Sequence, residues 1–187
     1  MNEVIKNIKM RRSVRYFEQK DIEPEILKEI IYAGNLAPTG MNAQPWRFVV
    51  VNGKDFRNKL SELALPRYKQ WLEKMPPEFK SMREEVDAKV HDPAYYDAPA
   101  IIFVIGKGMT KDLDCPMVCQ NIMLAARSFG IGSCWVFIGQ LPLDDITVRK
   151  TLELQEDEKV FGPIVLGYPK GDFPELPSKK DPIVKWL

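Results

Sequence analysis

Residues 114–129 constrain the fold most, because they read as one helix with almost no polar face. Asp114 is its expected N-cap, and Gly130 lies just past its end. Apolar side chains cover most of its circumference: Met117, Val118, Ile122, Met123, Leu124, Ala125, Ala126 and Phe129. A helix that is apolar all round is buried. In a domain this small, we expect it at the centre of the fold or at a subunit interface.

The length of 187 residues predicts a single domain, residues 1–187, with a core of its own. The net charge of +1 gives no reason to expect a nucleic acid or an anionic membrane as a partner. No apolar run reaches ~18 residues, and the N-terminus lacks the apolar core of a secretory signal. These features predict no membrane span, no export and a cytoplasmic location.

The cysteines and the single histidine do not predict a metal site. Three cysteines are an odd count and suggest no disulfide framework. Cys115 and Cys119 lie four residues apart on the expected helix, so a redox or metal pair is one interpretation. Buried thiols are the interpretation we favour. His91 has no set of fellow metal ligands and no identifiable partners for a nucleophilic triad.

Hydrophobic periodicity predicts helices mixed with strands along one unit. The expected helices cover the first ten residues, 24–34, 56–64, 114–129 and 143–152, and the expected strands cover 46–51, 100–105, 134–138 and 160–166. Residues 66–96, broken by Pro76 and Pro77, are expected to form irregular helices. They are either a lid over a site or a plain surface excursion. Neither a G-x-G-x-x-G fingerprint nor a P-loop is present, which disfavours a dinucleotide-binding Rossmann unit.

Residues 37–48 form a loop with more hydrogen-bonding groups than a simple connection requires. Two prolines stiffen the loop, and Thr39, Asn42 and Gln44 project polar groups from it. Side-chain amides offer donors and an acceptor, which suits a planar heterocycle with alternating C=O and N–H edges. An Asx-turn leading into a strand is the alternative interpretation.

Upstream, Arg11, Arg12, Ser13 and Arg15 fall within five residues. Arginine presents a planar fork of donors suited to phosphate, and serine adds a hydroxyl. In an extended segment, Arg11, Ser13 and Arg15 would share one side, with Arg12 opposed. A solvated basic surface is the alternative interpretation of this segment alone.

In this order, the two motifs resemble those of the flavin-dependent nitroreductase family. Its members carry R-x-S-x-R/K near the N-terminus and then a P-[ST]-x-x-N-x-Q-P-W-x-F loop. The matching residues here are Arg11, Ser13, Arg15, Pro38, Thr39, Asn42, Gln44, Pro45, Trp46 and Phe48. The resemblance continues through 114–139 and 162–169 to Lys179 and Lys180, so it covers nearly the whole chain.

The resemblance implies an α+β, three-layer fold in which helices flank a mixed, mostly antiparallel sheet, within an intertwined homodimer. It also implies FMN as the cofactor. Arg11, Arg12 and Ser13, with Lys179 or Lys180, would hold the phosphate. Arg15 would lie near N1 and the C2 carbonyl of the flavin, where a cation raises the reduction potential.

The same resemblance assigns two further segments to the flavin. The loop with Pro38, Thr39, Asn42 and Gln44 would reach it from the other chain, Asn42 addressing the pyrimidine or ribityl part. Backbone atoms of Cys134, Trp135 and Val136 would lie beside N5. Residues 136–138 lack the acidic residue that the family often has here, and the lid region lacks a clear flavin-binding asparagine.

The implied reaction is ping-pong. NADH or NADPH passes a hydride to the flavin and leaves, and a small-molecule oxidant (a nitroaromatic, quinone or enone) then takes it. No side chain need act as nucleophile or base, so we assign no catalytic residue. The alternatives are a protein that sequesters or delivers FMN without turnover, and a flavin-free structural dimer. Dehalogenation and flavin fragmentation also occur on this fold, so the fold alone does not fix the reaction.

Overall fold

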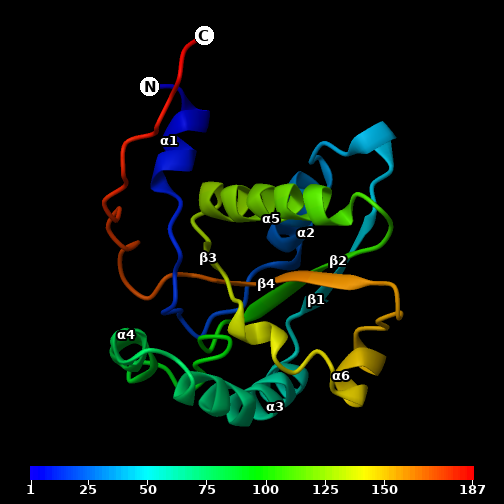
Figure 1. Cartoon of the computed structure of the whole chain (residues 1–187), viewed down its shortest axis with the longest axis vertical. Coiled ribbons are helices and arrows are strands. Elements are labelled where there is room, and N and C mark those ends of the chain that lie inside the picture. The colour runs from blue at the N-terminus through cyan, green and yellow to red at the C-terminus, as the bar shows by residue number, and fades with distance from the viewer.

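An antiparallel sheet of four strands runs through the middle of the protein, in the order β1-β2-β4-β3 (Figure 1). A computed structural model describes all residues, 1–187. The strands are β1 Trp46–Val51, β2 Ala100–Gly106, β3 Gly132–Trp135 and β4 Lys159–Gly167. All three strand pairs are antiparallel, and an isolated parallel bridge joins Ser13 to Ser133 at the outer edge of β3.

Helices cover both faces of the sheet. The helices are α1 Glu3–Met10, α2 Pro24–Asn35, α3 Lys54–Glu73, α4 Pro77–Asp87, α5 Lys111–Ser128 and α6 Ile146–Thr151, with short 3-10 turns η1 Gly40–Asn42 and η2 Ile138–Gln140. In Figure 1, α2 and α5 lie on one face, and α3 and α6 lie on the other. The predicted α+β, three-layer class is therefore confirmed. None of the helices is both long and apolar enough to cross a membrane.

Strand β2 is buried on both faces because its side chains alternate between two cores. The odd-numbered residues of 101–105 pack in one core with Leu60 and Tyr68 of α3. The even-numbered residues of 100–104 pack in the other core with Val118 and Ile122 of α5. Each such side chain stabilises the fold by ~1.5–3 kcal/mol when buried, so the continuous apolar run fixes β2 between the two helix layers.

Helix α5 begins at Lys111, so the prediction that Asp114 is its N-cap was wrong. Asp114 lies buried in the first turn, where its carboxylate accepts a hydrogen bond from Thr39 Oγ1 at 2.8 Å. A carboxylate in the first turn is favoured by the helix dipole. The helix is buried toward the sheet and α2, whereas Leu113 and Met117 are exposed in the single chain. The expected burial on all sides therefore holds for only part of the circumference within one chain.

The segment 66–96 is more regular than predicted. Helix α3 continues to Glu73, past its expected end at Ala64, although Pro66 lies inside it. Proline removes one helical hydrogen bond and usually breaks a helix. Here the buried side chains of Leu60 and Tyr68, on either side of it, keep the helix packed on the sheet. Helix α4 then starts with a proline in its first turn, a position that proline favours.

Two other predicted boundaries were wrong by a few residues. Strand β3 covers Gly132–Trp135 instead of 134–138, because the chain then turns into η2. Helix α6 begins at Ile146 instead of at Leu143. Asp145 is its N-cap and accepts hydrogen bonds from the backbone N–H of Thr147 and Val148, as aspartate does at helix starts.

The two ends of the chain leave apolar side chains uncovered. Helix α1 forms as predicted, but none of its residues is buried within the chain. The tail after Gly167 contains no helix or strand. Its residue Trp186 is 91% exposed, and Ile183 and Leu187 are fully exposed. A single chain therefore provides no cover for these groups.

Candidate functional site

The arginine segment, residues 11–15, runs along the outer edge of β3. The backbone N–H of Val14 donates to the carbonyl of Ser133 at 3.0 Å, next to the bridge between Ser13 and Ser133. Val14 is buried against Gly132, where a side chain would have no room. The sheet edge thus fixes the backbone from which the arginine side chains project.

A cavity of about 350 Å³ lies over this segment. Its lining residues are Arg11, Arg12, Ser13, Arg15, Pro174, Glu175, Leu176, Pro177 and Lys179. Four cations and one carboxylate give the lining a net charge of +3. The structure thus brings the predicted arginine segment together with Lys179, whereas Lys180 is not part of the lining. Arg12 lines the cavity as well, although its Nη1 turns back to the carbonyls of Lys9 and Arg11, at 2.6 and 2.8 Å.

Two buried donors of this segment have no partner in the chain. They are the Nε atoms of Arg12 and Arg15. Leaving a buried donor unpaired costs roughly 1–3 kcal/mol, so both guanidinium groups suit an acceptor supplied by a ligand. Phosphate oxygens and the carbonyls of a flavin ring are such acceptors. The residues present therefore fit an anionic, carbonyl-bearing cofactor.

Residues 134–136 present backbone to the same edge. Cys134 and Val136 are buried, so their side chains face the core and not a ligand. Strand β3 is an edge strand, and past the bridge at Ser133 no strand pairs with its outer side. Burial raises the pKa of the Cys134 thiol, and the charges of Arg15 and Arg11 counteract that rise. The arginine segment, which is bridged to the sheet at Ser133, therefore adjoins the segment predicted beside the flavin.

The amide-rich loop is strained and exposed at its tip. Met41, Asn42 and Gln44 have positive φ angles of 51°, 54° and 45°. Such backbone is costly for residues other than glycine and clusters at functional sites. Met41 is 99% exposed, and Pro38, Asn42 and Gln44 are exposed as well. Thr39, by contrast, uses its hydroxyl within the chain to bind Asp114.

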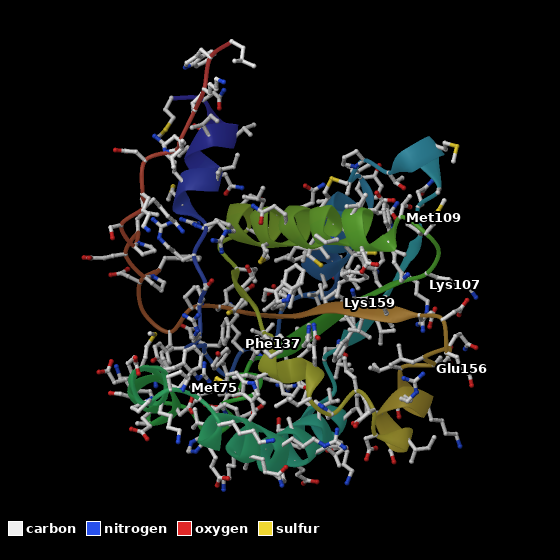
Figure 2. All side chains as sticks on the ribbon, in the orientation of Figure 1. Met75, Lys107, Met109, Phe137, Glu156 and Lys159 are labelled. Carbon is white, nitrogen blue, oxygen red and sulfur yellow. The ribbon has the colours of Figure 1, made fainter.

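The loop and the arginine segment lie at opposite ends of α5. Thr39 bonds the first turn of α5 at Asp114, whereas Arg127 in the last turn donates from Nε to the carbonyl of Met10 at 3.2 Å. Asp114 and Arg127 are separated by thirteen positions, which corresponds to roughly 20 Å along a helix at 1.5 Å per residue. Figure 2 shows Met109, next to the loop, on the opposite side of the molecule from helix α1, which leads into the arginine segment. The structure therefore does not bring the two predicted halves of the site together in one chain.

The cysteines are all free and buried. Burial raises the pKa of Cys115 to about 11 and that of Cys119 to about 12. Thiols with such values are largely protonated near neutral pH and are poor nucleophiles and metal ligands. The preferred interpretation of buried thiols is confirmed.

A larger cavity, about 690 Å³, lies elsewhere, between α3 and the segment before β2. Its lining includes four carboxylates, from Asp21, Glu62, Asp92 and Asp97, against the cations of Lys54 and Arg57. Such a lining does not suit a phosphate group, so its size does not make it the better candidate site.

Two residues close to the site could not be identified from the sequence. Tyr96 and Arg83 both lie in the segment 66–96, for which the sequence predicted no site residue. In the structure, Arg83 donates a hydrogen bond to the Tyr96 hydroxyl, and the guanidinium group of Arg15 lies over the Tyr96 ring. No sequence spacing marks this contact, because it joins three separate segments.

Comparisons with known proteins identify the family to which this fold belongs. The profile of the nitroreductase family matches residues 8–168. An Archaeoglobus fulgidus protein, provisionally named an NADH dehydrogenase/NAD(P)H nitroreductase, is 32% identical over 97% of this chain and 95% of its own length. The crystal structure of a Bacteroides fragilis nitroreductase with bound FMN superposes with a TM-score of 0.79, at 31% identity and full coverage of both chains. An iodotyrosine deiodinase of Thermotoga neapolitana is 26% identical over 92% of this chain and 91% of its own.

Proposed function

Because the chain belongs to the nitroreductase family, we propose that it is an FMN-dependent oxidoreductase that uses NADH or NADPH as the reductant. The observation that carries this proposal is the cationic cavity at the edge of β3, with its two unpartnered guanidinium Nε atoms. FMN-bound relatives of similar length support the choice of cofactor.

The residues around the cavity divide by their chemistry. Arg11, Arg12, Ser13 and Lys179 would bind the phosphate, since they offer several cations and a hydroxyl in one concave place. Lys180 stays a weaker candidate, because it lies outside that lining. Arg15 would bind the pyrimidine edge of the ring, with the backbone of residues 134–136 alongside.

FMN, when bound, would take a hydride from NAD(P)H and pass it to a nitroaromatic, quinone or enone. The protein's own part is to bind and orient the ring, to keep a positive charge beside its pyrimidine edge, and to shield one face. No side chain at the cavity is arranged as a nucleophile with an adjacent base. We therefore continue to assign no catalytic residue.

We propose further that the site is completed by a second copy of the chain. The strained loop at Met41–Gln44 is exposed and lies far from the arginine segment of its own chain. The apolar residues of α1 and the tail, and Leu113 and Met117 of α5, are likewise without full cover. A homodimer in which the loop of one chain reaches the cavity of the other would account for both features.

Purified protein is expected to carry FMN and not FAD, because the cavity offers one phosphate cluster and the chain has no dinucleotide fingerprint. Denaturing the protein and identifying the released flavin by chromatography checks this. FAD, or no flavin after reconstitution with free FMN, would contradict the proposal. Steady-state oxidation of NADH or NADPH with a nitroaromatic or a quinone then separates an enzyme from a protein that only carries FMN.

Gly132→Ala is expected to lower FMN occupancy. A Cβ at this position would lie 2.8 to 2.9 Å from three side-chain carbons of Val14. Valine is stiff, so the arginine segment must move off β3, at a cost of about 1–3 kcal/mol. The flavin absorbance per chain and urea unfolding measure both effects. Gly53→Ala is the matched control, because nothing lies within 4 Å of its added Cβ.

A further inference from the structure

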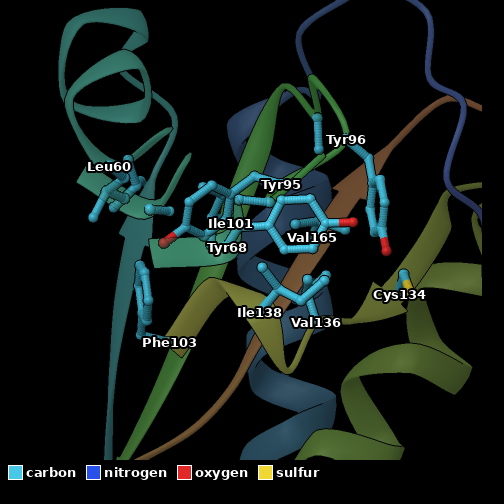
Figure 3. Close-up of a cluster of buried hydrophobic side chains, with 14 of the residues drawn as sticks. Leu60, Tyr68, Tyr95, Tyr96, Ile101, Phe103, Cys134, Val136, Ile138 and Val165 are labelled. Atoms are coloured by element: carbon cyan, nitrogen blue, oxygen red, sulfur yellow. The ribbon is translucent and has the colours of Figure 1, made fainter. Parts of the chain in front are cut away.

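Tyr96 occupies an unusual place beside the proposed flavin site. It is only 3% exposed and has a positive φ of 58°, in the segment just before β2. A bulky residue with such a backbone costs about 1–3 kcal/mol and persists only where its surroundings hold it. Figure 3 shows the Tyr96 side chain pointing toward Cys134 of β3, and both belong to one buried cluster. Tyr96 is therefore held firmly against the edge that carries the site.

Two guanidinium groups share the Tyr96 ring. The Cζ of Arg15 lies 5.9 Å from the ring centroid, and the Cζ of Arg83 lies 5.6 Å from it. Both distances are within the ~6 Å range of cation–π attraction. Arg83 Nη1 also donates to the Tyr96 hydroxyl at 2.8 Å. Tyr96 thus connects helix α4, which bears Arg83, to the arginine segment.

Arg83 is itself fixed on all sides. Its side chain is 11% exposed, and its Nη2 donates to Asp87 Oδ1 at 2.8 Å and to the carbonyl of Pro93 at 3.2 Å. Its Nε donates to the Tyr68 hydroxyl at 3.1 Å, and that hydroxyl donates to Asp87. Burial acts to lower the pKa of Arg83, but the hydrogen bonds to Tyr96 and Tyr68 outweigh it and raise that pKa. Arg83 is a rigid, permanent cation.

Arg15 has no comparable support of its own. Its Nε is buried without a partner, and the Tyr96 ring is the neighbour that its guanidinium group rests on. Whatever moves that ring therefore moves the charge of Arg15 relative to a ligand in the cavity.

We propose that Tyr96 and Arg83 are positioning residues: Arg83 fixes the Tyr96 ring, and the ring holds Arg15 at the pyrimidine edge of FMN. Helix α4 thereby sets the reduction potential of the flavin through Arg15. This inference rests on the proposed function, because it requires FMN in the cavity lined by Arg15.

Tyr96→Leu tests the proposal without changing any charge. The reduction potential of the bound FMN is expected to fall by most of the shift that Arg15→Ala produces, because the ring that supports the Arg15 guanidinium group is missing. Arg83→Lys keeps the positive charge but loses the planar fork, and it is expected to shift the potential in the same direction by less. Tyr16→Leu is the matched control. Tyr16 is the residue after Arg15, and Lys89 Nζ lies 5.7 Å from the centroid of its ring. Removing this ring is expected to leave the potential unchanged.

The decisive measurement repeats Tyr96→Leu in the Arg15→Ala protein. Residues that act through one another are non-additive, so no further shift is expected there. Equal shifts in both backgrounds would overturn the proposal, as would an unchanged potential in flavin-loaded Tyr96→Leu. Should Tyr96→Leu not fold, Tyr96→Phe keeps the ring and loses the bond from Arg83, and its smaller shift must vanish in the same way. Failure of the parent protein to bind FMN would instead refute the proposed function.

Discussion

Arg15→Ala is expected to lower the reduction potential of the bound FMN by roughly 30–60 mV while leaving part of the FMN affinity in place. A hydrogen bond to a charged group is worth about 1.5–3 kcal/mol, and ~30 mV corresponds to ~1.4 kcal/mol for a two-electron couple. The reduced ring carries negative charge near N1, so losing the cation penalises the reduced form more than the oxidised form. The other cations of the cavity, from Arg11, Arg12 and Lys179, remain to bind the phosphate.

Spectroelectrochemical titration of the flavin-loaded variant measures this shift. Arg15→Lys keeps the charge and is expected to show a smaller drop. Lys28→Ala removes a surface cation that pairs only with Glu25, and it is expected to show none. An unchanged potential in flavin-loaded Arg15→Ala would refute the role of Arg15, whatever the variant does to catalysis.

Deleting residues 183–187 is expected to abolish both the homodimer and stoichiometric FMN binding. The deletion removes Ile183, Val184, Trp186 and Leu187, all exposed in the single chain. Burying such side chains on a partner is worth ~1.5–3 kcal/mol each, and an interface of this kind should exceed ~2,000 Å² in total. Lys179 and Lys180 stay in the shortened chain. Any loss of FMN must therefore come through assembly, because mass action links the two.

Light scattering or sedimentation of the holo-protein at micromolar concentration, with flavin absorbance on the same sample, checks this prediction. Lys185→Ser is the matched control, since it changes the tail without removing an apolar group. The alternative is a tail that folds back on its own subunit. A full-length protein that runs as a 21.5 kDa monomer and still carries one FMN per chain would rule out an obligate dimer.

The sequence predicted the layers of this fold well because they depend on periodicity. Strand β2 lies where its apolar run predicted, and α2 and β4 differ from the expected ranges by a residue or so. The errors arose where packing overrides local signals. Pro66 does not end α3, because the buried residues beside it keep the helix on the sheet. Asp114 lies inside the first turn of α5, where it accepts a hydrogen bond from Thr39.

The site was less predictable because it depends on contacts between distant segments. Two motifs identified the arginine segment and the loop, and Lys179 joins the former in the structure. The alternation rule placed Arg12 on the opposite side, but its flexible side chain bends back over α1 and still lines the cavity. Tyr96 and Arg83 were missed because a ring shared by two guanidinium groups has no sequence pattern.

The arrangement of α5, with the loop at its first turn and the arginine segment at its last, has a genetic consequence under the two-chain site. Each chain then donates the loop to one centre and the arginines to the other. A chain that has lost the arginines of the cavity and a chain that has lost the loop would each form only defective centres by themselves. When the two are expressed together, however, a mixed dimer contains one centre with both defects and one with neither. Two null alleles of the same gene can therefore complement each other. In a mixed dimer of a defective and a normal chain, one of the two centres is then defective.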